Sequence, residues 1–97
     1  MPTRLYTIRQ SGSFKKKLKK IVRKDIRIKE VLLSKIQLLR LNPKDKILRS
    51  HKVTSSKFGE VFSSYITGNI RLIWKYDEND RIVLCLLDIG GHDDVYN

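Results

Sequence analysis

Apolar residues recur along the chain with two different periods, and the change of period marks the expected elements. Residues 4–9 alternate, with Tyr6 and Ile8 on one face, which predicts a short strand. Over residues 14–24 the apolar side chains return every three or four positions, which predicts an amphipathic helix. A second helical stripe begins at residue 25 or 26, runs to residue 41 and stops at an Asn-Pro pair. The short link between the stripes predicts an antiparallel helical hairpin.

The second half of the chain changes to strand periodicity. Residues 43–59 are polar and predict an irregular connection. Residues 60–66, 70–76 and 81–89 follow as three β-rich runs separated by turn-forming residues, so they predict an antiparallel meander. The fold class expected over residues 1–97 is a single α+β domain, with both helices packed on one face of a four-stranded sheet.

Alternation within the predicted sheet assigns its faces. Leu72, Trp74 and Tyr76 share the side that the helices should cover, and Arg71 lies on the other side. The last run is apolar on both faces, which predicts an interior strand. Its single Cys85 is expected to be a buried structural thiol, since one cysteine makes neither a disulfide within the chain nor a zinc site.

Positive charge is concentrated in the first half of the chain. The formal net charge is +11, and residues 1–52 hold 17 Lys and Arg against 3 Asp and Glu. Such a block suggests a polyanionic partner, either nucleic acid or an acidic protein. The outer face of the first helix carries no acid and is the first candidate surface; its basic residues are Lys15, Lys16, Lys19, Lys20 and Arg23. No apolar run reaches the length of a membrane span, so we expect a cytoplasmic protein.

The last eleven residues hold the most distinctive pattern. An apolar strand reaches Gly90 and Gly91, whose backbone freedom predicts a sharp turn that presents His92 at the edge of the sheet. Tyr96 follows four residues later, so one helical turn would bring both rings to one side. The adjacent carboxylates in this tail have no partner at metal-ligand spacing, and we expect neither a metal nor another cofactor.

The order of the predicted elements, a strand, two helices, a loop and three strands, together with the last residues of the chain, resembles the RelE/ParE superfamily of type II toxin–antitoxin toxins. The ending Gly-Gly-His-Asp-Asp-Val-Tyr is similar to the YafQ-like branch of ribosome-dependent mRNA interferases, whose tails read Gly-x-His-x-x-x-aromatic. The resemblance implies a toxin that cleaves mRNA in the ribosomal A site and contacts ribosomal RNA. It also implies an acidic, partly disordered antitoxin, encoded next to the toxin, that wraps it.

The resemblance further implies roles for single residues. His51 and His92 match the family's loop and tail histidines, and Tyr96 matches the aromatic residue that holds a base. At two other family positions this chain departs from the pattern, with Tyr65 in place of a histidine and Asn69 in place of an acid.

Metal-free RNA cleavage needs a base for the 2′-OH, an acid for the leaving 5′-oxygen and cations at the phosphate. We expect His92 to be the acid, and either His51 or Tyr65 to be the base, with Tyr96 stacking on a nucleobase. The cations expected at the phosphates are Arg71, Lys52, Arg49 and Lys57.

Two alternatives keep the same fold. ParE-like members poison DNA gyrase and leave RNA intact. A relic toxin would bind RNA without cutting it, and the Tyr65 and Asn69 departures agree with such a loss.

Overall fold

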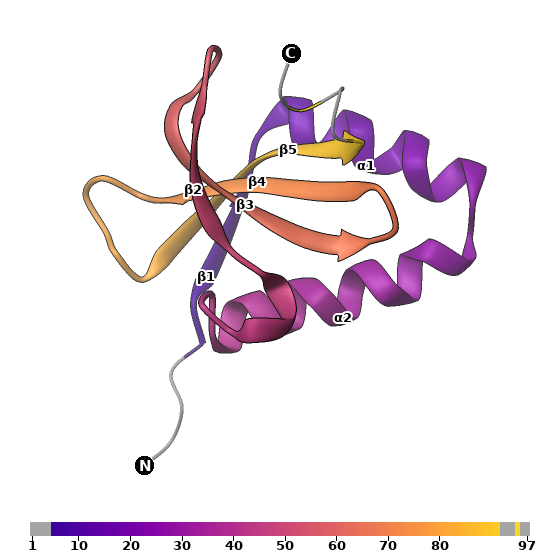
Figure 1. Ribbon diagram of the computed structural model, residues 1–97, viewed down its shortest axis with the longest axis horizontal. Helices are drawn as coiled ribbons and strands as arrows, with labels where there is room; N and C mark the ends of the chain where they lie inside the picture. The colour runs from indigo at the N-terminus through magenta and orange to yellow at the C-terminus, as the bar shows by residue number, and fades with distance from the viewer. Residues whose placement is uncertain (1–4, 92–94, 96–97) are drawn as a thin grey trace.

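The computed structural model describes residues 5–91 and residue 95 (Figure 1). Its elements, in chain order, are β1 (Thr7–Gln10), α1 (Gly12–Lys24), α2 (Arg27–Leu41), η1 (Lys46–Leu48), β2 (His51–Ser55), β3 (Gly59–Thr67), β4 (Ile70–Tyr76) and β5 (Val83–Gly91). Within this part of the chain, no helix is long and apolar enough to cross a bilayer. The α+β class predicted from the sequence is confirmed.

The described strands form one mixed sheet in the order β1-β5-β4-β3-β2. β1 runs parallel to β5, and every other neighbouring pair is antiparallel, so the predicted meander of β3, β4 and β5 is confirmed. The prediction of four strands is wrong, because residues 51–55 lie within the segment expected to be irregular. β2 is an edge strand with one sheet neighbour, and a polar sequence can form such a strand.

Local hydrogen bonds explain where the helices begin and end. Ser11 caps α1, since its Oγ accepts from the backbone N–H of Phe14 at 3.0 Å and donates to the carbonyl of Leu87 at 2.8 Å. The same hydroxyl therefore ties the start of α1 to β5. α2 ends at Asn42, before Pro43. The two helices meet at their connection and splay apart toward their far ends, α1 over β5 and α2 toward β3 (Figure 1).

The helix-covered face of the sheet holds the main core. Leu72 and Trp74 of β4 are fully buried against Phe14, Leu32 and Leu39 from the helices. Partly buried side chains, Tyr6, Ile8 and Tyr76 among them, pack around this cluster. The face assignments made from alternation are therefore confirmed. At about 25 cal/mol per Å² of apolar surface, this burial is the main source of stability.

The opposite face holds a smaller cluster of Val61, Ile73, Leu87 and Val95. β5 contributes side chains to both clusters. It lies between β1 and β4, so the interior position predicted from its apolar run is confirmed. Ile73 pairs with Asp88 and Trp74 pairs with Leu86, which leaves Leu87 as an extra residue in the ladder.

Candidate functional site

His51 is the first residue of β2, and its ring is held by a nearby carbonyl. Its Nδ1 lies 3.0 Å from the backbone oxygen of Arg49. A carbonyl only accepts hydrogen bonds, so Nδ1 carries the hydrogen and Nε2 keeps its lone pair in the neutral ring. The side chain is exposed, so Nε2 is available to take a proton from a bound molecule.

Tyr65 of β3 lies among three cations. The guanidinium carbons of Arg71 and Arg49 lie 5.1 and 5.4 Å from the centre of its ring, and Lys35 Nζ lies at 5.6 Å. Its hydroxyl oxygen accepts from the backbone N–H of Gly68 at 3.1 Å, which leaves the hydroxyl hydrogen free to donate. We call Tyr65, Lys35, Arg49 and Arg71 the cationic cluster. Sequence reasoning missed Lys35, since a lone lysine on a helix carries no distinguishing signal.

Register places His51, Tyr65 and Arg71 on one face of the sheet. Directly opposed residues share a face, and here His51 opposes Ser63 while Tyr65 opposes Arg71. Ser63 and Tyr65 are alternate residues of β3, so they face the same way. His51 and Tyr65 are thus diagonal neighbours, for which Cα separations of roughly 7–8 Å are typical. Arg71 in turn opposes Gly90, which brings the end of β5 to the same place.

A chain of hydrogen bonds that runs from the core to the surface fixes the segment that carries Arg49 and His51. The Trp74 indole N–H donates to Ser64 Oγ at 2.8 Å, and the Ser64 and Ser50 hydroxyls lie 2.6 Å apart. Ser50 Oγ donates to the carbonyl of Pro43 at 2.8 Å, so the proton between the two serines belongs to Ser64. Ser50 thereby connects the site to the core.

Arg49 reaches the cluster from a left-handed backbone conformation, with φ 48° and ψ 41°. Non-glycine residues adopt this region at a cost of about 1–2 kcal/mol. The turn after η1 ends at this residue, and its geometry directs the guanidinium toward Tyr65.

Two predicted phosphate ligands lie elsewhere. Lys52 opposes Phe62, which stacks on Trp74 on the helix-covered side, so Lys52 does not share the face of His51. Lys57 lies in the turn between β2 and β3, before Gly59, and Gly59 is six residues along β3 from Tyr65, or about 20 Å at strand rise. Alternation and strand length therefore separate both lysines from His51, and their roles in binding phosphates stay predictions. Arg49 and Arg71 do converge.

The basic residues predicted on the first helix all lie on α1 and are exposed: Lys15, Lys16, Lys19, Lys20 and Arg23. None of them belongs to the cationic cluster, because the main sheet contacts of α1 are with β5.

The tail residues predicted to act, His92 and Tyr96, lie outside the described residues, as do Asp93 and Asp94. β5 continues through Gly90 and ends at Gly91, so the turn predicted to present His92 falls outside the described residues and stays a prediction. Asn69 is an exposed residue of the turn between β3 and β4. No group of three metal-binding side chains occurs among residues 5–91 and 95.

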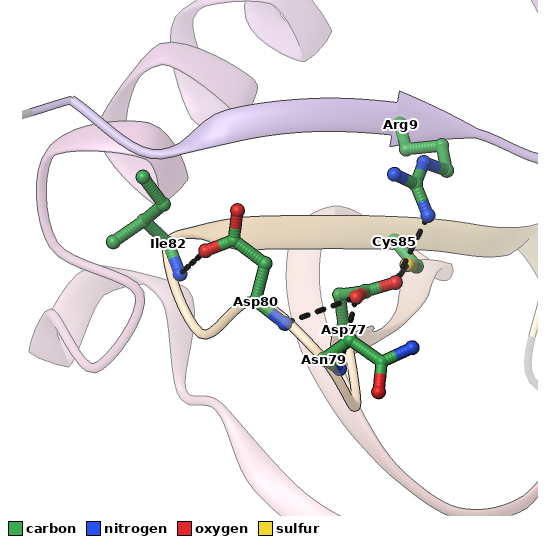
Figure 2. A network of polar contacts seen from close by, with 6 residues as sticks. All are labelled: Arg9, Asp77, Asn79, Asp80, Ile82 and Cys85. Atoms are coloured by element: carbon green, nitrogen blue, oxygen red, sulfur yellow. Dashed lines mark hydrogen bonds and ion pairs between the residues drawn. The ribbon is translucent and has the colours of Figure 1, made fainter.

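The far end of the sheet carries a second polar network (Figure 2). One Asp77 oxygen accepts from Asn79 and Asp80 backbone N–H groups, both at 3.1 Å. The other lies 2.9 Å from Arg9 Nη1. The Asn79 hydrogen bond, followed by the charge of Arg9, lowers the pKa of Asp77. Burial, followed by the charge of Asp77, raises the pKa of Cys85, whose side chain is partly buried rather than fully buried as the sequence predicted.

This network belongs to the turn between β4 and β5, where Asp80 Oδ1 also accepts from Ile82 N–H. It stabilises the turn at the opposite end of β4 from Arg71, so we assign it a structural role.

The sheet order and the helix pair define a fold shared with RelE- and YafQ-like toxins of type II toxin–antitoxin systems. The chain is similar to YafQ from E. coli strain BL21(DE3), with 19% identity, a TM-score of 0.66 and coverage of 95% of this chain and 99% of that one. It is similar to protein HP0894 from Helicobacter pylori, with 22% identity, a TM-score of 0.65 and coverage of 92% and 97%.

Another similar structure is the toxin–antitoxin complex RelBE2 from Mycobacterium tuberculosis, with 18% identity, a TM-score of 0.64 and coverage of 91% and 99%. No family model and no curated protein sequence matches the chain. At this level of identity the likeness establishes the fold, and the resemblance drawn from the sequence is confirmed to that extent.

Proposed function

We propose that this protein is the toxin of a type II toxin–antitoxin system and acts in the cytoplasm as a metal-independent endoribonuclease on ribosome-bound mRNA. The observation that carries the proposal is the His51 ring, fixed by Arg49 with Nε2 free and placed beside the cationic cluster. Structures of similar fold, among them the E. coli DinJ–YafQ complex, are toxin–antitoxin assemblies, which supports an antitoxin partner.

In the proposed reaction, His51 Nε2 takes the proton of the 2′-OH as its oxygen attacks the adjacent phosphorus. The bond from phosphorus to the 5′-oxygen breaks, and His92 protonates the leaving oxygen, giving a 2′,3′-cyclic phosphate and a 5′-hydroxyl end. Arg71 and Arg49 stabilise the charge that develops on the phosphoryl oxygens. Tyr96 stacks on a neighbouring base.

The geometry favours His51 over Tyr65 as the base. The neutral His51 ring keeps the Nε2 lone pair free to accept a proton, because its Nδ1 hydrogen is bonded to the Arg49 carbonyl. Tyr65 already accepts from the N–H of Gly68 and is surrounded by cations, so its hydroxyl hydrogen is suited to donate to a phosphate oxygen.

The test is cleavage of mRNA by purified protein on translating ribosomes, with the new 5′ ends mapped. We expect cuts in phase with codons, and a loss of about 10²–10⁴-fold in single-turnover rate for His51→Ala and for His92→Ala. Tyr65→Phe should lose less than either histidine variant, because it removes one hydrogen-bond donor to the phosphate and leaves the assigned base and acid in place. A rate unchanged in His51→Ala would refute the assigned base.

The same preparations separate the alternatives. Inhibition of gyrase supercoiling with intact mRNA would identify a ParE-like poison. Ribosome binding without cleavage, unaltered by the histidine substitutions, would identify an RNA-binding relic. Copurification of a small acidic protein encoded next to the chain would support the antitoxin.

A further inference from the structure

A groove on the helix side of the sheet is lined by residues outside the cationic cluster. Its volume is about 370 Å³, and it opens between α1 and the ends of β4 and β5. One wall presents Lys17, Lys20 and Lys24 of α1. Ile21, Ile70 and Ile89 supply apolar surface, and Gly90 and Gly91 leave its rim free of side chains. We call it the lysine groove.

The groove carries uncompensated positive charge. Lys17 Nζ lies 2.8 Å from Asp88 Oδ1, and the Asp88 side chain is only 7% exposed. This pair fixes Lys17 against the end of β5. Lys20 and Lys24 are exposed and make no ion pair with any described residue. Like charges four residues apart oppose helix formation, so Lys20 and Lys24 do not stabilise α1. Both ammonium groups are therefore available to bind an anion.

The chemistry of the walls selects the anion. Single-stranded nucleic acid is held by stacking its bases on aromatic side chains, and the lysine groove is lined by isoleucine instead. Lysine binds carboxylates and phosphates alike. The isoleucine walls suit aliphatic side chains, so they favour an acidic peptide over single-stranded nucleic acid. The rise from Lys20 to Lys24 is about 6 Å along the helix, close to the ~6.6 Å between alternate residues of an extended peptide.

We infer that the lysine groove docks an extended, acidic segment of a partner protein, with carboxylates on Lys20 and Lys24 and aliphatic side chains on Ile70 and Ile89. Alternate residues of an extended segment point to opposite sides, and the two walls of the groove take one set each. The inference rests on the proposed function for the identity of the partner, the antitoxin. The groove lies on the helix side, so docking there requires no contact with His51 or Tyr65.

The test uses the whole protein and two acetylated peptides of about ten residues, the length that an extended strand needs to cross the groove. One alternates glutamate with leucine, and the second alternates glutamate with glycine. Binding is followed by calorimetry and by NMR shifts of the Ile21, Ile70 and Ile89 methyl groups. We expect the leucine peptide to bind at least tenfold more tightly than the glycine peptide and to shift these methyl groups.

Matched charge reversals locate the site. The double variant Lys20→Glu with Lys24→Glu should weaken leucine-peptide binding about tenfold. The double variant Lys15→Glu with Lys19→Glu changes the net charge equally on the outer face of the same helix, and should weaken binding less than about threefold. Equal losses would overturn the inference, because binding would then depend on overall charge.

Three other outcomes also overturn it. They are no peptide binding, peptide binding that leaves the isoleucine methyl groups unshifted, and a uridine oligonucleotide that shifts them when the peptides do not. The peptide-binding assays contain neither ribosomes nor mRNA. Failure of the groove therefore leaves the cleavage test of His51 standing, and failure of cleavage leaves the groove standing.

Discussion

Replacing Ser64 by alanine should destabilise the protein well beyond the loss of one small side chain. Ser64 Oγ accepts a hydrogen bond from the indole N–H of Trp74 and is hydrogen-bonded to the hydroxyl of Ser50. Both Ser64 and Trp74 are fully buried. Without that oxygen the indole N–H has no acceptor, and a buried unpaired donor costs about 1–3 kcal/mol. We use about 2 kcal/mol as the expected loss in the free energy of unfolding.

A loss of this size corresponds to a fall in Tm of roughly 8–16 °C for a chain of this length. Thermal unfolding followed by circular dichroism and by tryptophan fluorescence measures the change. Ser34→Ala is the matched control, because Ser34 is exposed on α2, where alanine should be neutral or slightly stabilising. A Ser64→Ala Tm within about 2 °C of the control would refute the argument that this chain of hydrogen bonds stabilises the core.

Ser64→Ala also bears on the site. Ser50 lies between Arg49 and His51, and Ser64→Ala removes its hydrogen bond to Ser64. The positions of Arg49 and His51 should then be less fixed, so the cleavage rate should fall even at temperatures where the variant remains folded. A destabilised variant with full activity would show that the register of β2, rather than the hydrogen-bonded chain, positions His51.

Two further predictions use other features. The lowered pKa of Asp77 means that its contribution to stability is present above the carboxyl's ordinary pKa of about 3.9 and is lost as pH falls through the folded-state value. Asp77→Asn should therefore melt below the parent at neutral pH, with the gap closing in acid; a gap independent of pH would contradict this. Arg49→Gly should raise the free energy of unfolding by up to about 1 kcal/mol in urea titrations, because glycine tolerates the left-handed backbone, while lowering the cleavage rate. A variant that is both less stable and fully active would contradict both roles of Arg49.

The sequence predicted the fold where periodicity was strong. Helical stripes and the alternation of β4 identified the core, including Trp74, since these signals come from burial on one side. β2 was missed because only Val53 of its five residues is apolar, and an edge strand needs no more. The parallel pairing of β1 with β5 joins residues far apart in the chain, which no local pattern encodes.

The candidate site was predicted in part. His51, Tyr65, Arg49 and Arg71 were each expected from residue type and resemblance, and the register of the sheet brings them together. Lys35 was missed because it comes from a helix whose orientation over β3 depends on tertiary packing.

The open edges of the sheet give the positive charge a second consequence. β1 and β2 are the outermost strands, they are short, and they carry Arg9 and Lys52. Cations on exposed edges keep the strands of neighbouring copies from pairing, so the repulsion that opposes folding also protects the isolated chain from aggregating. When a polyanion only partly neutralises that charge, exposed edge strands of neighbouring copies can pair. The protein should therefore be most soluble either without a polyanion or when it is saturated with one.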